Sequence, residues 1–282
     1  MEQHNKGHEG AEVPITFNST NDCYRGTIWE TDVEHLHYIV LHYNNKYDVE
    51  IQCLEIGNIM HVRLAALRGK SIKNPYLKNK FGGFFGDGPY TKHGYPKTYT
   101  TWYKILYRLD EDIQKSTSKN AAYVGTTIDE NWLNFQVFAD WYVNYVSELN
   151  PKYFTEYQID KDILTWDTGI KRYSPETCCI VPEAINLACS NYGRERTVED
   201  LPIGVHCNGT GGKSFSINIS MYGKSPYLGT FSTSEEAFKV YKMNKEQYLK
   251  ELADFYYNEN AIKLDVYKAL YNIDIKPYAN KI

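Results

Sequence analysis

Short stretches rich in β-branched and aromatic residues recur in the first third of the chain. Three of them have the length of strands: residues 35–43, 47–54 and 59–64. Asparagine and glycine between them, at residues 44–46 and 57–58, favour turns. Residues 20–98 are therefore predicted to form a small β module, a barrel or curled sheet, which the glycine-rich residues 82–89 close as a loop. Four histidines lie in these strands at spacings that are not diagnostic of a metal site: His35, His37, His42 and His61.

The middle of the chain, residues 99–200, changes to helical periodicity. Two sets of apolar residues recur every three or four positions: Trp102, Ile105, Leu106 and Leu109, then Trp132, Phe135, Phe138, Ala139 and Tyr142. Residues 114–120 are polar and are predicted to form a loop between the two helices. Aromatic stripes of this kind usually form core, and we interpret them in that way.

Residues 201–256 are predicted to form a three-stranded sheet with one helix packed across it. Residues 214–220 alternate between polar and apolar, which places Phe215, Ile217 and Ile219 on one face. A turn at residues 222–224 leads to a short strand at 226–231, and Ser232 with Glu235 has the spacing of a capping box. The long helix that follows has an apolar face: Phe238, Tyr241, Tyr248, Leu249 and Leu252.

Two terminal segments complete a predicted α+β organisation. Residues 1–19 are read as a polar tail, and residues 257–282 as a helical tail whose amphipathic part, 264–271, docks on the body or on a second copy. No stretch approaches the roughly 20 apolar residues of a membrane span. The first twelve residues lack the apolar run of a secretion signal. We therefore expect an intracellular protein that makes no membrane contact.

Composition narrows the function classes. The apolar content of 42% and the aromatic content of 15% exclude a disordered chain. The net charge of −4 counts against a dedicated nucleic-acid binder, because such proteins carry a basic surplus. The 26 tyrosines suit cores and protein interfaces alike. The six cysteines include no C-x-x-C pair, and the adjacent Cys178 and Cys179 are expected to be buried structural thiols.

The C-terminal part resembles an AP2-type DNA-binding domain. The matching stretches are Ile203-Gly204-Val205, Tyr227-Leu228-Gly229-Thr230-Phe231 and Ser234-Glu235-Glu236-Ala237. The resemblance implies that the sheet reads the major groove with arginine and tryptophan side chains. This chain departs from that pattern, because no arginine lies between residues 203 and 231. The expected DNA-facing positions are instead polar and uncharged: Ser214, Ser216, Asn218 and Ser220.

The middle part resembles the HNH-like proteins of bacteriophages. The matching positions are Trp102, Trp132 with Phe135, residues 159–162 and 173–178, and Asn186. The resemblance implies a β-hairpin and a helix that hold one divalent metal, with a histidine beside the aspartate as general base. Here Lys161 follows Asp160, and no histidine lies between residues 95 and 205. We therefore interpret the nuclease-like positions as degenerate, with no catalysis, metal or cofactor: Asp160, Lys161, Asp162 and Asn186.

Two functional hypotheses remain open. The overall length, the β-rich N-terminal part and the stretch Glu176-Thr177-Cys178-Cys179 resemble the Gabija anti-defence proteins. That resemblance implies a homo-oligomeric phage inhibitor in the host cytoplasm, which binds a bacterial defence complex and keeps it from DNA. The alternative is a phage DNA-binding protein, or less readily an active HNH endonuclease. Its contacts would come from a basic segment and the sheet face: Arg68, Lys70, Lys73, Ser214, Ser216, Asn218 and Lys224.

Overall fold

The computed structural model describes residues 24–32, 34–116, 123–190, 201–209 and 214–278. Its contacts divide the chain into a first unit, Met1–Leu77, and a second unit, Lys78–Ile282. Each unit has a separate hydrophobic core, and the fold is mixed α+β, as the periodicity predicts. The first unit ends at Leu77, whereas we expected the β module to extend to residue 98. No helix within the described ranges is long and apolar enough to cross a membrane.

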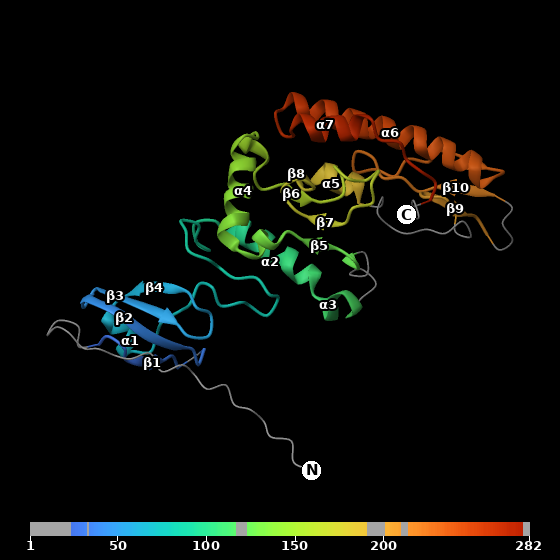
Figure 1. Ribbon diagram of the computed structural model, residues 1–282. Helices are drawn as coiled ribbons and strands as arrows, with labels where there is room; N and C mark the ends of the chain where they lie inside the picture. Colours follow the sequence, from blue (N-terminus) through green and yellow to red (C-terminus); the bar gives the residue numbers. More distant parts are fainter. Residues whose placement is uncertain (1–23, 33, 117–122, 191–200, 210–213, 279–282) are drawn as a thin grey trace, which may run out of the picture. The chain divides into compact units, whose positions relative to one another are not determined.

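The first unit is a four-stranded antiparallel sheet, in the order β1-β2-β3-β4, with one short helix (Figure 1). Its elements are β1 Ile28–Glu30, β2 His37–Asn45, β3 Asp48–Cys53, β4 Ile59–Val62 and α1 Leu64–Arg68. Alternate residues of β3, from Val49 to Cys53, are buried against Leu64 and Leu67 of α1. The three predicted strands are confirmed. The predicted third strand was too long, because α1 already begins at Leu64.

The second unit begins with helices that pack through aromatic side chains. Its helical elements up to residue 153 are α2 Pro96–Leu109, α3 Glu111–Ser116, a 3₁₀ turn Glu130–Leu133, α4 Phe135–Ser147 and a 3₁₀ turn Pro151–Tyr153. The indole nitrogen of Trp102 donates to the carbonyl oxygen of Trp132 at 2.7 Å, deep in the core. α4 begins after Trp132 because the side chain of Asn134 accepts the backbone N–H of Gln136.

Two expectations for this region were wrong in part. The predicted polar loop at residues 114–120 begins with helix, because Gln114 is part of α3; residues 117–120 lie outside the described ranges. The glycine-rich residues 82–89 belong to the second unit and not to the unit of the first sheet. Gln136 holds them on α4: its side chain accepts from Tyr90 N and donates to the carbonyl oxygens of Tyr90 and Phe85, at 3.0–3.3 Å.

Four short strands and a helix form the centre of the second unit. Thr127–Ile128 (β5) pairs in parallel with Arg172–Tyr173 (β7), and Tyr157–Asp160 (β6) pairs antiparallel with Cys179–Pro182 (β8). β8 leads directly into α5, Glu183–Cys189. The residues of β8 are buried throughout, which explains why this stretch shows no polar alternation.

The C-terminal part is a three-stranded sheet in the order β11-β10-β9 under a long helix (Figure 1). Its elements are β9 Val205–Cys207, β10 Phe215–Ile217, β11 Thr230–Phe231, α6 Ser234–Asn258 and α7 Leu264–Tyr271. The predicted strands at 214–220 and 226–231 were too long. The amphipathic segment 264–271 is α7, and it packs on α6 of the same chain.

The N-terminal cap of α6 lies one residue later than predicted. Thr233 Oγ1 accepts the backbone N–H of Glu236 at 3.2 Å, and the Glu236 carboxylate accepts that of Thr233 at 3.3 Å. We expect Thr233→Ala to lower the free energy of unfolding by about 1 kcal/mol. Ser232→Ala is the control, because Ser232 lies outside the capping box and its loss should cost a few tenths of that. Chemical denaturation of both variants checks this; equal losses would contradict the assigned cap.

Candidate functional site

The candidate site is the strand pair β6–β8 and the helix α5, the region that contains the nuclease-like positions. Asp160 is the last residue of β6 and pairs with Cys179 of β8. Asn186 lies on α5, which contacts both strands. No hydrogen bond joins Asn186 to Asp160, Lys161 or Asp162 in the described part of the chain. The structure therefore groups Asp160, Lys161 and Asp162 as neighbours in one turn, and places Asn186 on the helix that follows.

Asp160 ends its strand by holding the turn that follows it. Its Oδ1 accepts the backbone N–H groups of Asp162 at 2.7 Å and Ile163 at 2.9 Å. Burial, and next to it the charge of Asp162, raise the pKa of Asp160 above its ordinary value, although both backbone hydrogen bonds and Lys161 act in the opposite direction. The Asp160 carboxylate thus accepts hydrogen bonds from the backbone of the turn, but its negative charge is only partly compensated in this buried position.

Lys161 lies in the interior, with 5% of its surface exposed. Its Nζ is 2.6 Å from Asp162 Oδ1, and it lies 6.0 Å from the ring centroids of both Tyr123 and Tyr173. At these distances the aromatic faces offer a buried ammonium group a favourable environment. Lys161 is therefore a buried side chain that packs near two aromatic rings and pairs with Asp162.

A second cation reaches this turn from α2. Arg108 Nη1 donates to the hydroxyl oxygen of Tyr173 at 3.3 Å, and its guanidinium lies 5.1 Å from the centroid of the Tyr123 ring. Burial lowers the pKa of Arg108, but Tyr173, Tyr123 and Asp160 outweigh burial and raise it. We call these six residues the hairpin cluster: Arg108, Tyr123, Asp160, Lys161, Asp162 and Tyr173.

The hairpin cluster does not fit a divalent metal. Its two cations repel a further positive charge, and neither lysine nor arginine offers an acceptor atom. The Asp160 oxygen nearest the turn already accepts two N–H groups. Within the described ranges, no three His, Cys, Asp or Glu side chains converge in a way that could hold a metal ion. The arrangement can orient and stabilise the turn, because Asp160 accepts two backbone N–H groups and Asp162 pairs with Lys161.

Comparisons with protein-family models, curated proteins and solved structures find no match for the chain. Its function is therefore inferred from its own residues. The sequence analysis named candidate residues in three regions: the hairpin cluster, the face of the three-stranded sheet and the basic segment.

The paired cysteines lie beside the hairpin cluster as free, buried thiols. Burial raises the pKa of Cys178 to about 12, and burial likewise raises the pKa of Cys179 well above its ordinary value. Thr177 Oγ1 donates to the carbonyl oxygen of Arg172 at 2.6 Å and so fixes the turn that precedes both cysteines. Since the thiolate is the reactive form, both thiols are chemically quiet at neutral pH.

The outer face of the three-stranded sheet is polar and carries no cation on its strands. Ser216 pairs with His206 on one side and Thr230 on the other, and its hydroxyl donates to Asn208 Oδ1 at 2.8 Å. None of the residues of β9, β10 and β11 is lysine or arginine. The other candidates lie along the same stretch and its turn: Ser214, Asn218 and Lys224.

The basic candidates of the first unit differ in their contacts. Arg68 donates to the hydroxyl oxygen of Tyr24 at 2.6 Å, and Lys70 Nζ lies 3.3 Å from Asp32. Lys73 is exposed. Two of these three side chains thus make contacts within the first unit.

The sequence analysis did not find Arg108 or Tyr123 as members of the site, and it included Tyr173 only within the matching stretch 173–178. Arg108 does carry a weak signal, because it stands between the apolar positions Leu106 and Leu109 of one helix. Its partner Tyr173 lies 65 residues away in sequence. A contact of that separation follows from tertiary packing, and no local pattern shows it.

We expect Asp160→Asn to keep the fold and to raise the free energy of unfolding at pH 7. Asparagine retains the oxygen that accepts the two N–H groups but carries no charge. A raised pKa in the folded state means that Asp160 favours folding most below its unfolded pKa of about 3.9. That contribution is lost as the pH rises through the folded pKa, so the advantage of Asp160→Asn grows from pH 4 to pH 7.

Asp129→Asn is the matched control for that experiment. Hydrogen bonds from Asn131 and the partner Arg172 lower the pKa of Asp129, so its removal should cost more at pH 7 than at pH 4. Urea denaturation at both pH values measures the two trends. A greater loss of stability for Asp160→Asn at pH 7 than at pH 4 would show that Asp160 is a compensated charge and contradict the prediction.

Proposed function

We propose that this chain is a non-catalytic phage accessory protein that binds a bacterial anti-phage defence complex, of the kind called Gabija, and blocks its access to DNA. The observation that carries the non-catalytic part is the buried Lys161, paired with Asp162 at 2.6 Å beside Arg108. A metal-dependent nuclease needs an open site with acceptor ligands and a base at this turn. Two cations stand there instead.

The sheet and helix of the C-terminal part support a protein partner over DNA. The order β11-β10-β9 under α6 is the arrangement expected of an AP2-like module at residues 201–256. Its outer strands lack the cations that phosphate and guanine contacts require. Together with the net charge of −4, this favours a module that has kept its fold and lost its DNA-reading side chains.

Exposed aromatic side chains are the second feature that favours a protein partner. Phenylalanine and tyrosine are enriched at protein interfaces, where a rigid ring buries a large area. In the part of the chain that the structure describes, eight of these residues are exposed: Tyr47, Tyr107, Phe154, Tyr222, Tyr227, Phe255, Tyr257 and Tyr271. We further propose that the chain acts as a homo-oligomer in the host cytoplasm, as the resemblance to the anti-defence proteins implies.

A pull-down of the tagged full chain from bacterial lysate tests the proposal, with nuclease added to remove bridging DNA. We expect a defence protein in stoichiometric amount, retained at high salt, because apolar and aromatic contacts are little screened. The Asp160→Asn protein should recover the same partner. Recovery only of material that disappears with nuclease treatment, or that elutes steeply with salt, would contradict a protein partner and favour DNA binding.

A further inference from the structure

The open edge of the first sheet is the strand β4. In the order β1-β2-β3-β4, only one side of β4 has a partner strand. Cys53 N donates to the carbonyl oxygen of Asn58, so the hydrogen-bonded pairs of this ladder continue at Met60. The backbone N–H and C=O groups of Ile59 and His61 therefore face away from β3, where no other backbone group of the described chain bonds to them.

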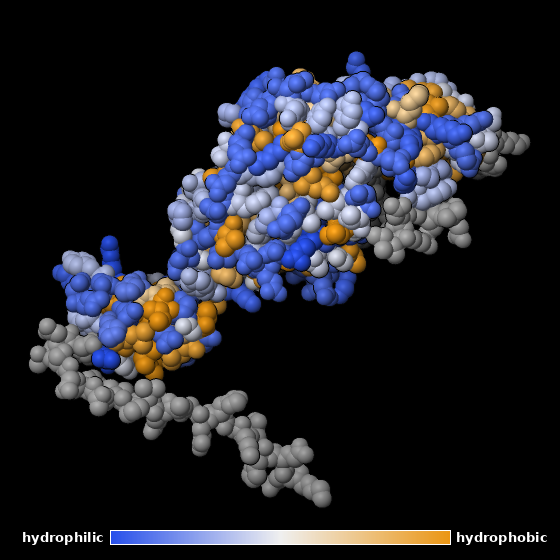
Figure 2. Space-filling model, turned by 45° about the horizontal axis from the view of Figure 1, so that its top comes forward, coloured by the Kyte–Doolittle hydropathy of each residue, from blue (hydrophilic) through white to orange (hydrophobic). Residues whose placement is uncertain are grey.

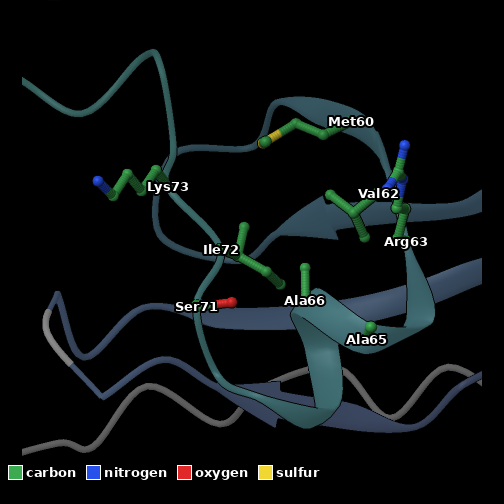
Figure 3. A pocket seen from close by; sticks show the side chains of 8 residues that line it. All are labelled: Met60, Val62, Arg63, Ala65, Ala66, Ser71, Ile72 and Lys73. Atoms are coloured by element: carbon green, nitrogen blue, oxygen red, sulfur yellow. The ribbon is translucent and has the colours of Figure 1, made fainter.

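A groove runs along this edge. Its floor is apolar, and it is made by Met60 and Val62 of β4, Ala66 of α1 and Ile72 of the segment that follows the helix (Figure 3). Figure 2 shows apolar side chains on the surface of this unit, and its exposed large apolar residues include Ile28, Leu54 and Ile56. The groove differs from these because it combines an apolar floor with unpaired backbone groups.

Two cations border the groove. Figure 3 shows Arg63 and Lys73 on opposite sides of the apolar floor. Both are exposed and neither has an ion-pair partner in the part of the chain that the structure describes, in contrast to Lys70, which pairs with Asp32. No acidic residue lines the groove. The groove therefore offers positive charge to an occupant that is itself apolar and acidic.

We propose that β4 and this groove bind an extended peptide segment of a partner protein, whose groove-facing side chains are apolar at the centre and acidic at both ends. The segment adds as a fifth strand to the edge of the sheet. Its backbone pairs with Ile59 and His61, its apolar side chains enter the groove, and its carboxylates lie at the two ends of the groove toward Arg63 and Lys73. Every second side chain of a strand faces the same way, so a single peptide satisfies both requirements.

The composition of β4 supports this use of the edge. Protein sheets protect an open edge by keeping the strand short, or with lysine, proline or a bulge, which prevents an incoming strand from pairing. β4 is short, with the sequence Ile59-Met60-His61-Val62, but it contains no lysine or proline and its register with β3 is unbroken. The inference adds a binding surface on the first unit, and it does not depend on the identity of the host complex or on the hairpin cluster.

Fluorescence anisotropy of the full chain with a labelled peptide tests the proposal. The probe is a seven-residue peptide with glutamate at both ends, valine at its third and fifth positions and threonine at the other positions, and the comparison peptide has lysine in place of glutamate. We expect saturable binding of the glutamate peptide below about 1 mM, the range of weak specific complexes. The double variant Arg63→Glu/Lys73→Glu should weaken it by about tenfold or more and should bind the lysine peptide instead.

A proline at each edge provides a matched pair of variants. Ile59→Pro removes an N–H group that points away from the sheet, at the first position of an edge strand, where proline is tolerated. Ile28→Pro makes the same change on the opposite edge of the sheet. Val40 N donates to Thr27 O, so Thr27 faces β2 and the N–H group of Ile28, the next residue, faces outward. Binding should be lost in Ile59→Pro and retained in Ile28→Pro, with both proteins folded by circular dichroism.

Four outcomes of the peptide titrations would overturn the proposal. These are no binding of the glutamate peptide, equal binding of the two peptides, equal loss in both proline variants, and displacement of the peptide from the wild-type protein by a DNA duplex. A dimer in solution that Ile59→Pro dissociates would likewise overturn it, since the groove would then hold a second copy of the chain. Because the peptide titration needs no host partner, failure of the pull-down leaves this result interpretable.

Discussion

Replacing Gly204 with alanine is expected to lower the free energy of unfolding of the second unit by about 3 kcal/mol. Gly204 has a φ of +75°, a conformation that costs any residue with a Cβ atom. A Cβ atom there would lie 2.2 Å from the ring of Tyr241 on α6, and Tyr241 is buried. The glycine marks the place where the three-stranded sheet approaches its helix most closely, so backbone strain and a steric clash add.

Gly209→Ala is the control that separates the two contributions. Gly209 has a φ of +83°, but a Cβ atom at that position would meet nothing within 4 Å. This variant should therefore show only the cost of strain, about 1 kcal/mol. Urea denaturation followed by circular dichroism measures both. Equal losses in the two variants would mean that α6 moves aside easily, and that the sheet and helix are not closely packed.

Replacing Asp162 of the Lys161–Asp162 pair should lower the free energy of unfolding more than replacing Lys161. Asp162→Asn leaves a buried ammonium without its nearest anion, and we expect a loss of about 2 kcal/mol. This is less than for a fully buried pair, because 49% of the Asp162 side chain is exposed. Lys161→Met keeps the volume and removes the buried charge, while water can solvate the released Asp162. Its expected change is within about 1 kcal/mol of zero.

The double variant Lys161→Met/Asp162→Asn completes this comparison. If Asp162→Asn destabilises the protein because it leaves the buried ammonium group of Lys161 without an anion, removing the lysine as well should restore most of the stability. The free energies of unfolding of the two single variants and the double variant are measured by denaturation. A large loss in Lys161→Met, not recovered in the double variant, would show that the ammonium has a further role in the second unit.

Local sequence patterns predicted which helices and strands are present more reliably than the residues at which they begin and end. The β-hairpin strands of the first unit follow from period-two alternation, which continues through Val49, Ile51 and Cys53. The start of α6 could not be decided in this way. Ser232 and Thr233 are both good caps, and each has a glutamate three residues later. Tertiary packing selects Thr233, because Ala237 and Tyr241 are the positions buried in the folded chain.

Long-range contacts explain what the sequence did not reveal about the candidate site. The sequence shows directly that a lysine follows Asp160. It does not show that Lys161 is buried or that it shares aromatic neighbours with Arg108, because α2 and the turn after β6 are distant in sequence. Likewise, composition marks residues 82–89 as a loop, but only the hydrogen bonds of Gln136 show which unit holds it.

Incubation of the protein with plasmid and single-stranded DNA tests the central claim most directly, namely that the hairpin cluster stabilises a turn and performs no chemistry. Mg²⁺, Mn²⁺, Ni²⁺ and Zn²⁺ are added in turn, and Asp160→Asn protein is assayed in parallel. The account predicts no cleavage by the wild-type protein above the level of Asp160→Asn, with any of the metals. Cleavage that requires a divalent metal and disappears in Asp160→Asn would contradict it.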